Sequence, residues 1–422
     1  MIILSDKLRY ASNRIFLKLI TTIKLIITLL YFGTSSDYAI IAFILSITNA
    51  SILVISDIVS LIFTRKKINK SINQFNNYLE NYLPAIQYSV IILGFVSFII
   101  CNFKREFLNI SNLELVFLVS LCVFMAYINL IRTAHSTFYW SSNGIRSFTK
   151  KSLSSNLFGL FVFLITFKIT VLSIPISIIS SEIFLIISIS RNWNVFFFDK
   201  FTLNFSKIKR SFFISKKYLF PFLLNFTAIL FAISEQNIAT NISLSFIAII
   251  SYTNLILNNY DSLIGFEEKA ISLVSNKLIQ DLPGLLKMRA VLLFLLSILF
   301  FIIAFYIDNT SFNLGQLSSQ DLSLILYLAA FILPSNLFSI QQSLLYRANV
   351  NNKKAFLSFI YLFVILIFIF IYSLLLSSFA YMYPLIIYTS LHYFYNIGRY
   401  ISEAFIFEKN SNYKFFDDNA HG

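Results

Sequence analysis

Twelve mostly apolar stretches of about twenty residues each constrain this chain more than any other feature. They cover residues 10–32, 38–64, 84–103, 112–131, 152–171, 173–190, 218–236, 242–263, 285–307, 321–343, 355–377 and 381–402. A helix that crosses the hydrocarbon core of a bilayer needs roughly 17–25 such residues. Each stretch is almost continuously apolar, whereas the strands of a membrane barrel alternate apolar and polar side chains. The sequence therefore predicts an all-α, polytopic membrane protein with about twelve transmembrane helices.

The composition excludes several other classes of protein. Hydrophobic residues make up 58% of the 422 residues and charged residues only 12%, about half of the usual charged share. The two cysteines and three histidines have neither disulfide-framework nor metal-site spacing. The chain also lacks a glycine-rich GxxxxGK phosphate loop. We expect no cofactor, no metal centre and no ATP-driven motor in this chain, and we do not expect an enzyme.

The chain has 33 basic and 19 acidic residues. The basic residues are concentrated in alternate loops, which indicates a membrane topology rather than a surface for nucleic acid. If the twelve stretches cross the membrane in turn, thirty basic residues fall on one side, and only Lys104, Arg105 and Lys168 fall on the other. Counting only residues outside the spans changes these numbers to 24 and two. Cytoplasmic loops are the ones enriched in Lys and Arg. Both termini are therefore predicted to be cytoplasmic.

The longest inner linker divides the chain into two halves. We predict a six-helix bundle over 1–190, a basic cytoplasmic linker over 191–217, a second six-helix bundle over 218–407 and a cytoplasmic tail over 408–422. Halves with an even number of spans enter the membrane in the same direction and are therefore parallel repeats. Thr48-Asn49 in the second span and Thr253-Asn254 in the eighth give this repeat faint support, which coincidence would also explain.

The first span carries a cationic stripe. At about 100° per residue, Arg14, Lys18 and Lys24 share one arc with Thr21 and Thr28. Charges inside a span cost roughly 2.5–3.5 kcal/mol each on insertion scales, so they usually face a cavity or a partner. We therefore predict Arg14, Lys18 and Lys24 as substrate-binding residues. The alternative is that Arg14 and Lys18 only extend their charged ends towards the inner headgroups.

Polar side chains also interrupt the second and eighth spans. Asn49 and Asp57 lie in the second, and Asn254, Asn258 and Asp261 recur on one face of the eighth. We predict the three asparagines as substrate-binding residues and the two aspartates as ion-coupling residues. Hydrogen bonding between helices is the alternative for the eighth span.

Two glutamates and one polar row lie in the remaining spans. Glu182 lies near the middle of the sixth span, where an unpaired carboxylate is expected to be protonated, and we predict it as a third ion-coupling residue. Glu235, at the predicted outer end of the seventh span, is interpreted as an interfacial group. His392, Asn396 and Arg399 recur at i, i+4 and i+7 and predict a polar seam running to the cytoplasmic interface.

A family resemblance rests on segments from both halves. The chain has a basic first helix, an outer turn over Tyr31–Tyr38 and a second helix with Ser56-Asp57-Ile58 before Arg65-Lys66-Lys67. Residues 220–239 and 332–354 add to it. These features resemble the Wzx-type polysaccharide repeat-unit flippases of the multidrug/oligosaccharidyl-lipid/polysaccharide (MOP) exporter superfamily. Thr34 and Ala39 depart from the Pro and the last Gly of the family's outer turn.

The resemblance implies a transporter that moves undecaprenyl-diphosphate-linked oligosaccharide from the inner to the outer leaflet by alternating access. It implies a multi-pass protein of the bacterial inner membrane that serves O-antigen or capsule synthesis. The implied partners are the lipid-linked substrate, membrane lipids, and a polysaccharide polymerase with its chain-length regulator.

Two alternatives remain open: a multidrug exporter of the same superfamily and an integral-membrane glycan polymerase. Against a polymerase, the longest outer segment, 308–320, is short for a catalytic loop. A major-facilitator transporter also has twelve spans, but its Gly…Asp-Arg…Gly-Arg pattern is missing from residues 63–75.

Overall fold

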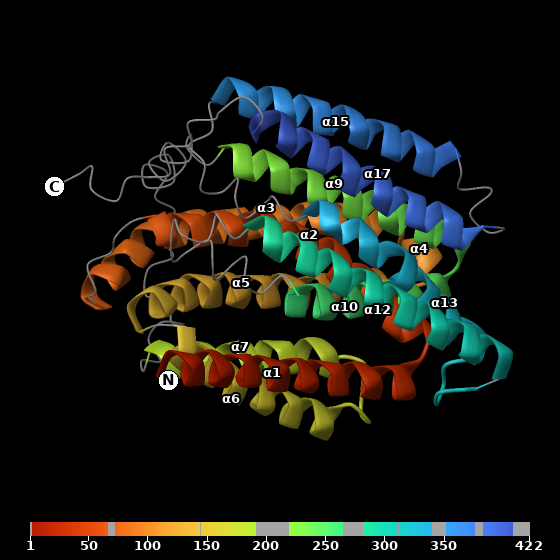
Figure 1. Ribbon diagram of the computed structural model, residues 1–422, viewed down its shortest axis with the longest axis horizontal. Coiled ribbons are helices and arrows are strands. Elements are labelled where there is room, and N and C mark those ends of the chain that lie inside the picture. Colours follow the sequence, from red (N-terminus) through yellow and green to blue (C-terminus); the bar gives the residue numbers. More distant parts are fainter. Residues whose placement is uncertain are drawn as a thin grey trace. The chain divides into compact units, whose positions relative to one another are not determined.

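The computed structural model describes residues 2–65, 72–143, 145–190, 219–264, 282–310, 312–339, 352–375 and 383–407, and these residues are almost entirely helical (Figure 1). The first helices are α1 (Ile2–Phe32), α2 (Ser36–Arg65), α3 (Ile72–Phe103), the short α4 (Arg105–Leu108), α5 (Asn112–Asn143), α6 (Ile145–Thr166) and α7 (Ser173–Ser190). The remaining helices are α9 (Leu219–Ile242), α10 (Leu244–Ile264), α12 (Leu282–Thr310), α13 (Ser319–Ile332), the 3-10 helix η4 (Leu333–Ser339), α15 (Asn352–Leu375) and α17 (Pro384–Phe407).

Twelve long helices in the described residues correspond one to one to the twelve predicted spans. Six of them contain an apolar stretch of at least 18 residues that is able to cross a membrane by length and composition, within the part of the chain that the structure describes. The all-α, multi-pass fold is therefore confirmed. The cytoplasmic location of the termini stays a prediction.

Two predicted loops are largely helical. The predicted spans 112–131 and 152–171 leave a loop over 132–151. This prediction is wrong, because α5 continues to Asn143 and α6 begins at Ile145. Most of the loop expected over 65–83 belongs to α3, which begins at Ile72. The apolar pattern ends before the helix does, because a helix that leaves the hydrocarbon region keeps its backbone hydrogen bonds while its side chains become polar.

The tenth span ends in a change of helix type. Pro334 lacks an N–H and cannot donate to the carbonyl of Ala330, so α13 gives way to η4 near this residue. The hydroxyl of Ser297 on α12 donates to that Ala330 carbonyl instead. A neighbouring helix thus satisfies the backbone group that proline frees, as membrane interiors require.

The chain divides into two compact units, each with its own core. The first comprises 1–26 and 40–226, and the second comprises 27–39 and 227–422. The short segment 27–39, from the end of α1 to the start of α2, therefore belongs to the second unit. The predicted linker 191–217 and tail 408–422 lie outside the described residues, and the predicted domain boundaries stay a prediction.

In the first unit, α7 packs on α5 and α6, and α3 packs on α5. A cluster of buried side chains from α3, α5 and α7, including Val90, Leu130 and Ile186, fills this core. In the second unit, α12 packs on α13 and α15 on α17. Its buried cluster joins α9, α15 and α17 through residues such as Phe231, Leu366 and Leu391. Figure 1 shows α9, α15 and α17 running side by side.

The turn between α1 and α2 packs within the second unit, and two glycines allow its close approach. Gly33 and Gly315 both have a positive φ, 51° and 63°, which glycine adopts without steric cost. A Cβ on Gly33 would lie 2.8 Å from the carbonyl oxygen of Gln316, so the two turns approach too closely for a side chain there. The N–H of Gln316 donates to Leu30 O at 3.2 Å, and Tyr252 donates to Gly33 O at 2.8 Å.

Candidate functional site

Lys24 lies inside the first unit and contacts α7. Its Nζ donates to Ser177 Oγ at 3.4 Å, and its charge interacts with the carboxylate of Glu182. The hydroxyl of Ser177 itself donates to Ile174 O, which leaves its lone pairs for the ammonium. Gly159 on α6 makes room, since a Cβ there would lie 2.6 Å from Ser181 Cβ and 3.3 Å from Lys24 Nζ.

Glu182 is paired. Its Oε2 lies 2.6 Å from Nε of Arg132 on α5, and the two side chains are 15% and 31% exposed. Arg132 lies one residue beyond the predicted span 112–131, and it belongs to the continued helix α5. Sequence alone does not show this pair, because it depends on the packing of α5 against α7.

Lys24, Arg132 and Glu182 form an ionic cluster, hereafter the unit 1 cluster. It contains two cations and one carboxylate, so its net charge is positive when all three are ionised. Surrounded by apolar helices, such a group attracts anions more strongly than the same charges in water. The net charge of the cluster therefore favours an anionic ligand over a cationic one.

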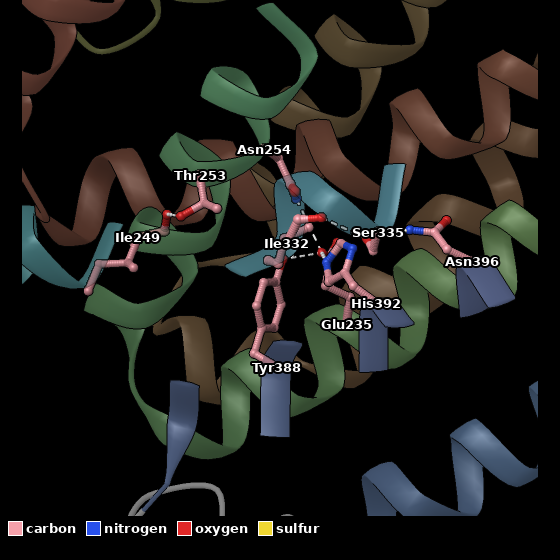
Figure 2. Close-up of polar contacts among 9 residues, drawn as sticks. All are labelled: Glu235, Ile249, Thr253, Asn254, Ile332, Ser335, Tyr388, His392 and Asn396. Carbon is pink, nitrogen blue, oxygen red and sulfur yellow. Dashed lines mark hydrogen bonds and ion pairs between the residues drawn. The ribbon is translucent and has the colours of Figure 1, made fainter. Parts of the chain in front are cut away.

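A second polar cluster lies in the second unit around Glu235, which is only 4% exposed. Three donors converge on its Oε1, as Figure 2 shows: Tyr388 hydroxyl, His392 Nε2 at 3.0 Å and Asn254 Nδ2 at 3.2 Å. The interpretation of Glu235 as an interfacial group is wrong, because α9 continues to Ile242 and the carboxylate is buried by α10 and α17. We call these four residues the unit 2 cluster.

The surroundings of the unit 2 cluster fix its geometry. The His392 ring meets Phe231 and Tyr388 edge to face, with centroids 5.0 and 4.8 Å apart. One turn further along α17, Asn396 donates to Ser335 Oγ of η4 at 2.8 Å. His392, Asn396 and Arg399 are all buried, so the predicted polar seam is an inward face of α17.

The other predicted site residues fall into three groups. The side chains of Arg14, Asp57 and Asp261 lie outside the described part of the structure. Lys18 is half-buried, whereas Asn49 and Asn258 are exposed in their units. Asn254 points to Glu235 instead. No finding tests the predicted roles, which stay predictions.

The paired threonines of the predicted repeat have the same local geometry. Thr48 Oγ1 donates to Ile44 O at 2.6 Å, and Thr253 Oγ1 donates to Ile249 O at 2.9 Å. Both hydroxyls therefore bond the carbonyl four residues earlier, in α2 and α10 respectively. Thr133, Thr166, Thr310 and Thr389 make the same bond in other helices, so this agreement does not distinguish a repeat from coincidence, and the repeat stays a prediction.

The fold is that of transporters of the MOP superfamily. No protein-family model matches the sequence, and no curated protein matches it significantly. The structure of the lipid II flippase MurJ in an inward closed conformation superposes with a TM-score of 0.60 at 14% identity, covering 94% of this chain and 86% of that one. An inward-facing multidrug resistance MATE family transporter superposes with a TM-score of 0.50 at 13% identity, covering 93% and 96%.

Proposed function

We propose that this chain flips an undecaprenyl-diphosphate-linked oligosaccharide from the inner to the outer leaflet for synthesis of a surface polysaccharide. The substrate has an anionic diphosphate, a polar glycan and a lipid tail that can stay in the bilayer. The fold supports this proposal, since its likeness to a lipid II flippase extends over almost the whole chain. We place the protein in the bacterial inner membrane, next to a polysaccharide polymerase and its chain-length regulator.

The unit 1 cluster carries the proposal. Lys24 and Arg132 bring two cations to one carboxylate inside a bundle of apolar helices. A diphosphate that leaves water loses its hydrogen bonds to water and needs charged donors to replace them. Hydrogen bonds from charged donors are stronger than those between neutral groups. In this proposal Lys24 binds the diphosphate together with Arg14 and Lys18, and Asn49 and Asn258 contact the glycan. Asn254 joins them only when its amide leaves Glu235, to which it donates in this structure.

A multidrug exporter is the second candidate, favoured by the likeness to a multidrug resistance MATE family transporter. Both functions use alternating access, and neither involves catalysis. The unit 1 cluster favours an anionic cargo over a cationic drug, because its net charge is positive.

The location of the accumulated intermediate tests the proposed function. In cells that lack this protein, single lipid-linked repeat units should accumulate on the inner leaflet, measured by their protection from a membrane-impermeant glycan probe in spheroplasts. Accumulation of unpolymerised units on the outer leaflet would indicate a polymerase. Normal surface glycan together with drug sensitivity would indicate a multidrug exporter.

We also propose that transport is coupled to an ion, with Asp57, Glu182 and Asp261 as candidate coupling residues. Each carboxylate is replaced by alanine, and transport is measured with and without an ion gradient. Unchanged gradient dependence in all three variants would contradict this assignment.

A further inference from the structure

A groove runs between α3 and α5 on the surface of the first unit, with a volume of about 580 Å³. Both helices have the length and composition of membrane spans. Residues on the rim of the groove are about half exposed, among them Ile91 at 52% and Phe124 at 47%. Because the core of a bilayer contains no water, the opening of this groove faces hydrocarbon.

The lining of the groove is almost entirely apolar. The buried side chains of Val90 and Val119 form its floor. Gly94 lets α3 approach α5 closely within it, since a Cβ at Gly94 would lie 2.8 Å from Val123 Cγ2. Ser120 adds only a small side chain to the wall. Such a lining suits a hydrocarbon chain.

One end of the groove carries two larger polar side chains, Gln87 and Tyr127, which are both buried. They hydrogen-bond to each other. A charged headgroup would need ionised partners to replace its hydration, and the described lining contains no charged residue. The groove therefore suits the apolar part of a lipid rather than its headgroup.

The depth of the groove indicates which lipid chain fits it. We take Asn112, where the span on α5 begins, as the predicted outer boundary of the hydrocarbon core. At a rise of about 1.5 Å per residue, the groove extends along α5 from about 6 Å below this boundary, at Val116, to about 22 Å below it, at Tyr127. The core is about 30 Å thick, so the groove crosses the midplane. The acyl chain of a phospholipid ends near the midplane and would fill only half of it.

The proposed cargo has a chain long enough for the whole groove. An undecaprenyl tail is longer than one leaflet is thick, and it must follow its diphosphate from the inner to the outer leaflet. A groove that crosses the midplane contacts such a tail both before and after the headgroup has moved.

The groove also lies close to the unit 1 cluster along α5. Arg132 follows Tyr127 by five residues, which is about 8 Å along the helix axis. At about 100° per residue, Arg132 lies nearly opposite the groove-lining residues of α5. One helix thus presents a cation to the inside of the bundle and an apolar groove to the membrane.

We propose that the groove between α3 and α5 binds the undecaprenyl tail of the cargo, an inference that rests on the proposed function and names the part of the cargo that this surface binds. The tail stays on the membrane side of α5 while the diphosphate and glycan change leaflets. The length of the isoprenoid chain then determines how well a cargo is transported.

Crosslinking tests what occupies the groove. Full-length protein in proteoliposomes of phosphatidylethanolamine and phosphatidylglycerol carries benzoylphenylalanine in place of Phe124, and radiolabelled undecaprenyl phosphate is the probe. Irradiation should attach the probe to this position. The same replacement of Phe161, a comparably exposed ring on α6 outside the groove, should give little product. Excess unlabelled undecaprenyl phosphate should compete with the probe, and added phosphatidylglycerol should not.

Transport tests what the groove does. Ile91→Trp fills the groove from its rim, and Ile92→Trp is the matched control, because Ile92 is as exposed and lies outside the lining. Ile91→Trp should slow flipping of the undecaprenyl-linked repeat unit by about tenfold, the effect of losing about two buried methylene groups. Ile92→Trp should flip it as the wild type does. Both variants should flip the same repeat unit on a farnesyl diphosphate at the wild-type rate, because that short tail does not fill the groove.

The outcomes separate the two proposals. Wild-type proteoliposomes that never flip the repeat unit contradict the proposed function, and the tail site with it. Undiminished flipping by Ile91→Trp, or equal crosslinking at Phe124 and Phe161, keeps the flippase and overturns the tail site. Crosslinks at Phe124 that phosphatidylglycerol displaces, or that join two copies of the chain, assign the groove to membrane lipid or to a dimer and overturn the tail site as well.

Discussion

At the scale of single residues, the most informative side chains are charges placed in apolar helices. Lys24 stands out in the sequence because it lies in mid-span, and the structure adds its partner Ser177 and its neighbour Glu182. The sequence cannot show that Glu182 is paired, since Arg132 is fifty positions away and lies where the apolar pattern has already ended. Glu235 is misassigned because α9 continues beyond the predicted span to Ile242, and because its partners come from the distant helices α10 and α17.

Replacing Lys24 tests the unit 1 cluster. Lys24→Ala should lower surface-glycan export by about tenfold or more, since one hydrogen bond to a charged group contributes about 1.5–3 kcal/mol. Complementation of a flippase-null strain measures the loss, with membrane insertion checked by immunoblot. Lys24→Arg should retain most export, and Lys168→Ala serves as the matched lysine control. Full complementation by Lys24→Ala would contradict the predicted role.

Replacing Glu182 separates its structural role from its functional one. Glu182→Gln should lower the thermal unfolding temperature in detergent, because removing one partner of a buried ion pair costs about 3–5 kcal/mol. The 31% exposure of Arg132 reduces that cost through solvent screening. The double variant Arg132→Met, Glu182→Leu should recover stability and still fail in export. Recovered export would assign the pair a structural role alone.

At the scale of elements, the sequence predicts which helices exist, but it does not predict where each helix ends. Apolar runs locate all twelve long helices, because the bilayer leaves no other regular structure for such runs. Their ends depend on contacts outside the apolar pattern. The change from α13 to η4 follows Pro334, a local signal, yet the Ser297 hydroxyl that satisfies the Ala330 carbonyl comes from α12.

The docking of the α1–α2 turn gives a prediction at this scale. Tyr252 is fully buried, stacks on Tyr38 with centroids 4.5 Å apart, and donates to Gly33 O. Tyr252→Phe keeps the ring and leaves that buried carbonyl without its donor, so it should cost about 1–3 kcal/mol. Thermal unfolding should occur at a lower temperature than for Tyr361→Phe, a matched change on the exposed face of α15. Equal unfolding temperatures would mean that another donor replaces Tyr252.

At the scale of the whole molecule, the distribution of basic residues predicts the orientation. Both termini should be cytoplasmic, because thirty of the 33 basic residues fall on the predicted inner side. Single cysteines introduced at residues 5 and 418, in a chain whose Cys101 and Cys122 are replaced by serine, should resist a membrane-impermeant maleimide in intact cells. Both should react after permeabilisation. Labelling of either terminus in intact cells would reverse the assigned topology.

Composition and spacing were sufficient to establish a polytopic all-α protein, because each apolar run must satisfy its own backbone hydrogen bonds in lipid. They also identified Lys24 and Glu182 as costly charges, since burial of a charge depends on its depth in the span. The partners of these charges depend on which helices touch. Only tertiary packing brought α5 to α7 and α17 to α9, and with them Arg132 to Glu182 and His392 to Glu235. Side chains that far apart in sequence meet through the sum of many weak contacts between helices, which no local pattern encodes.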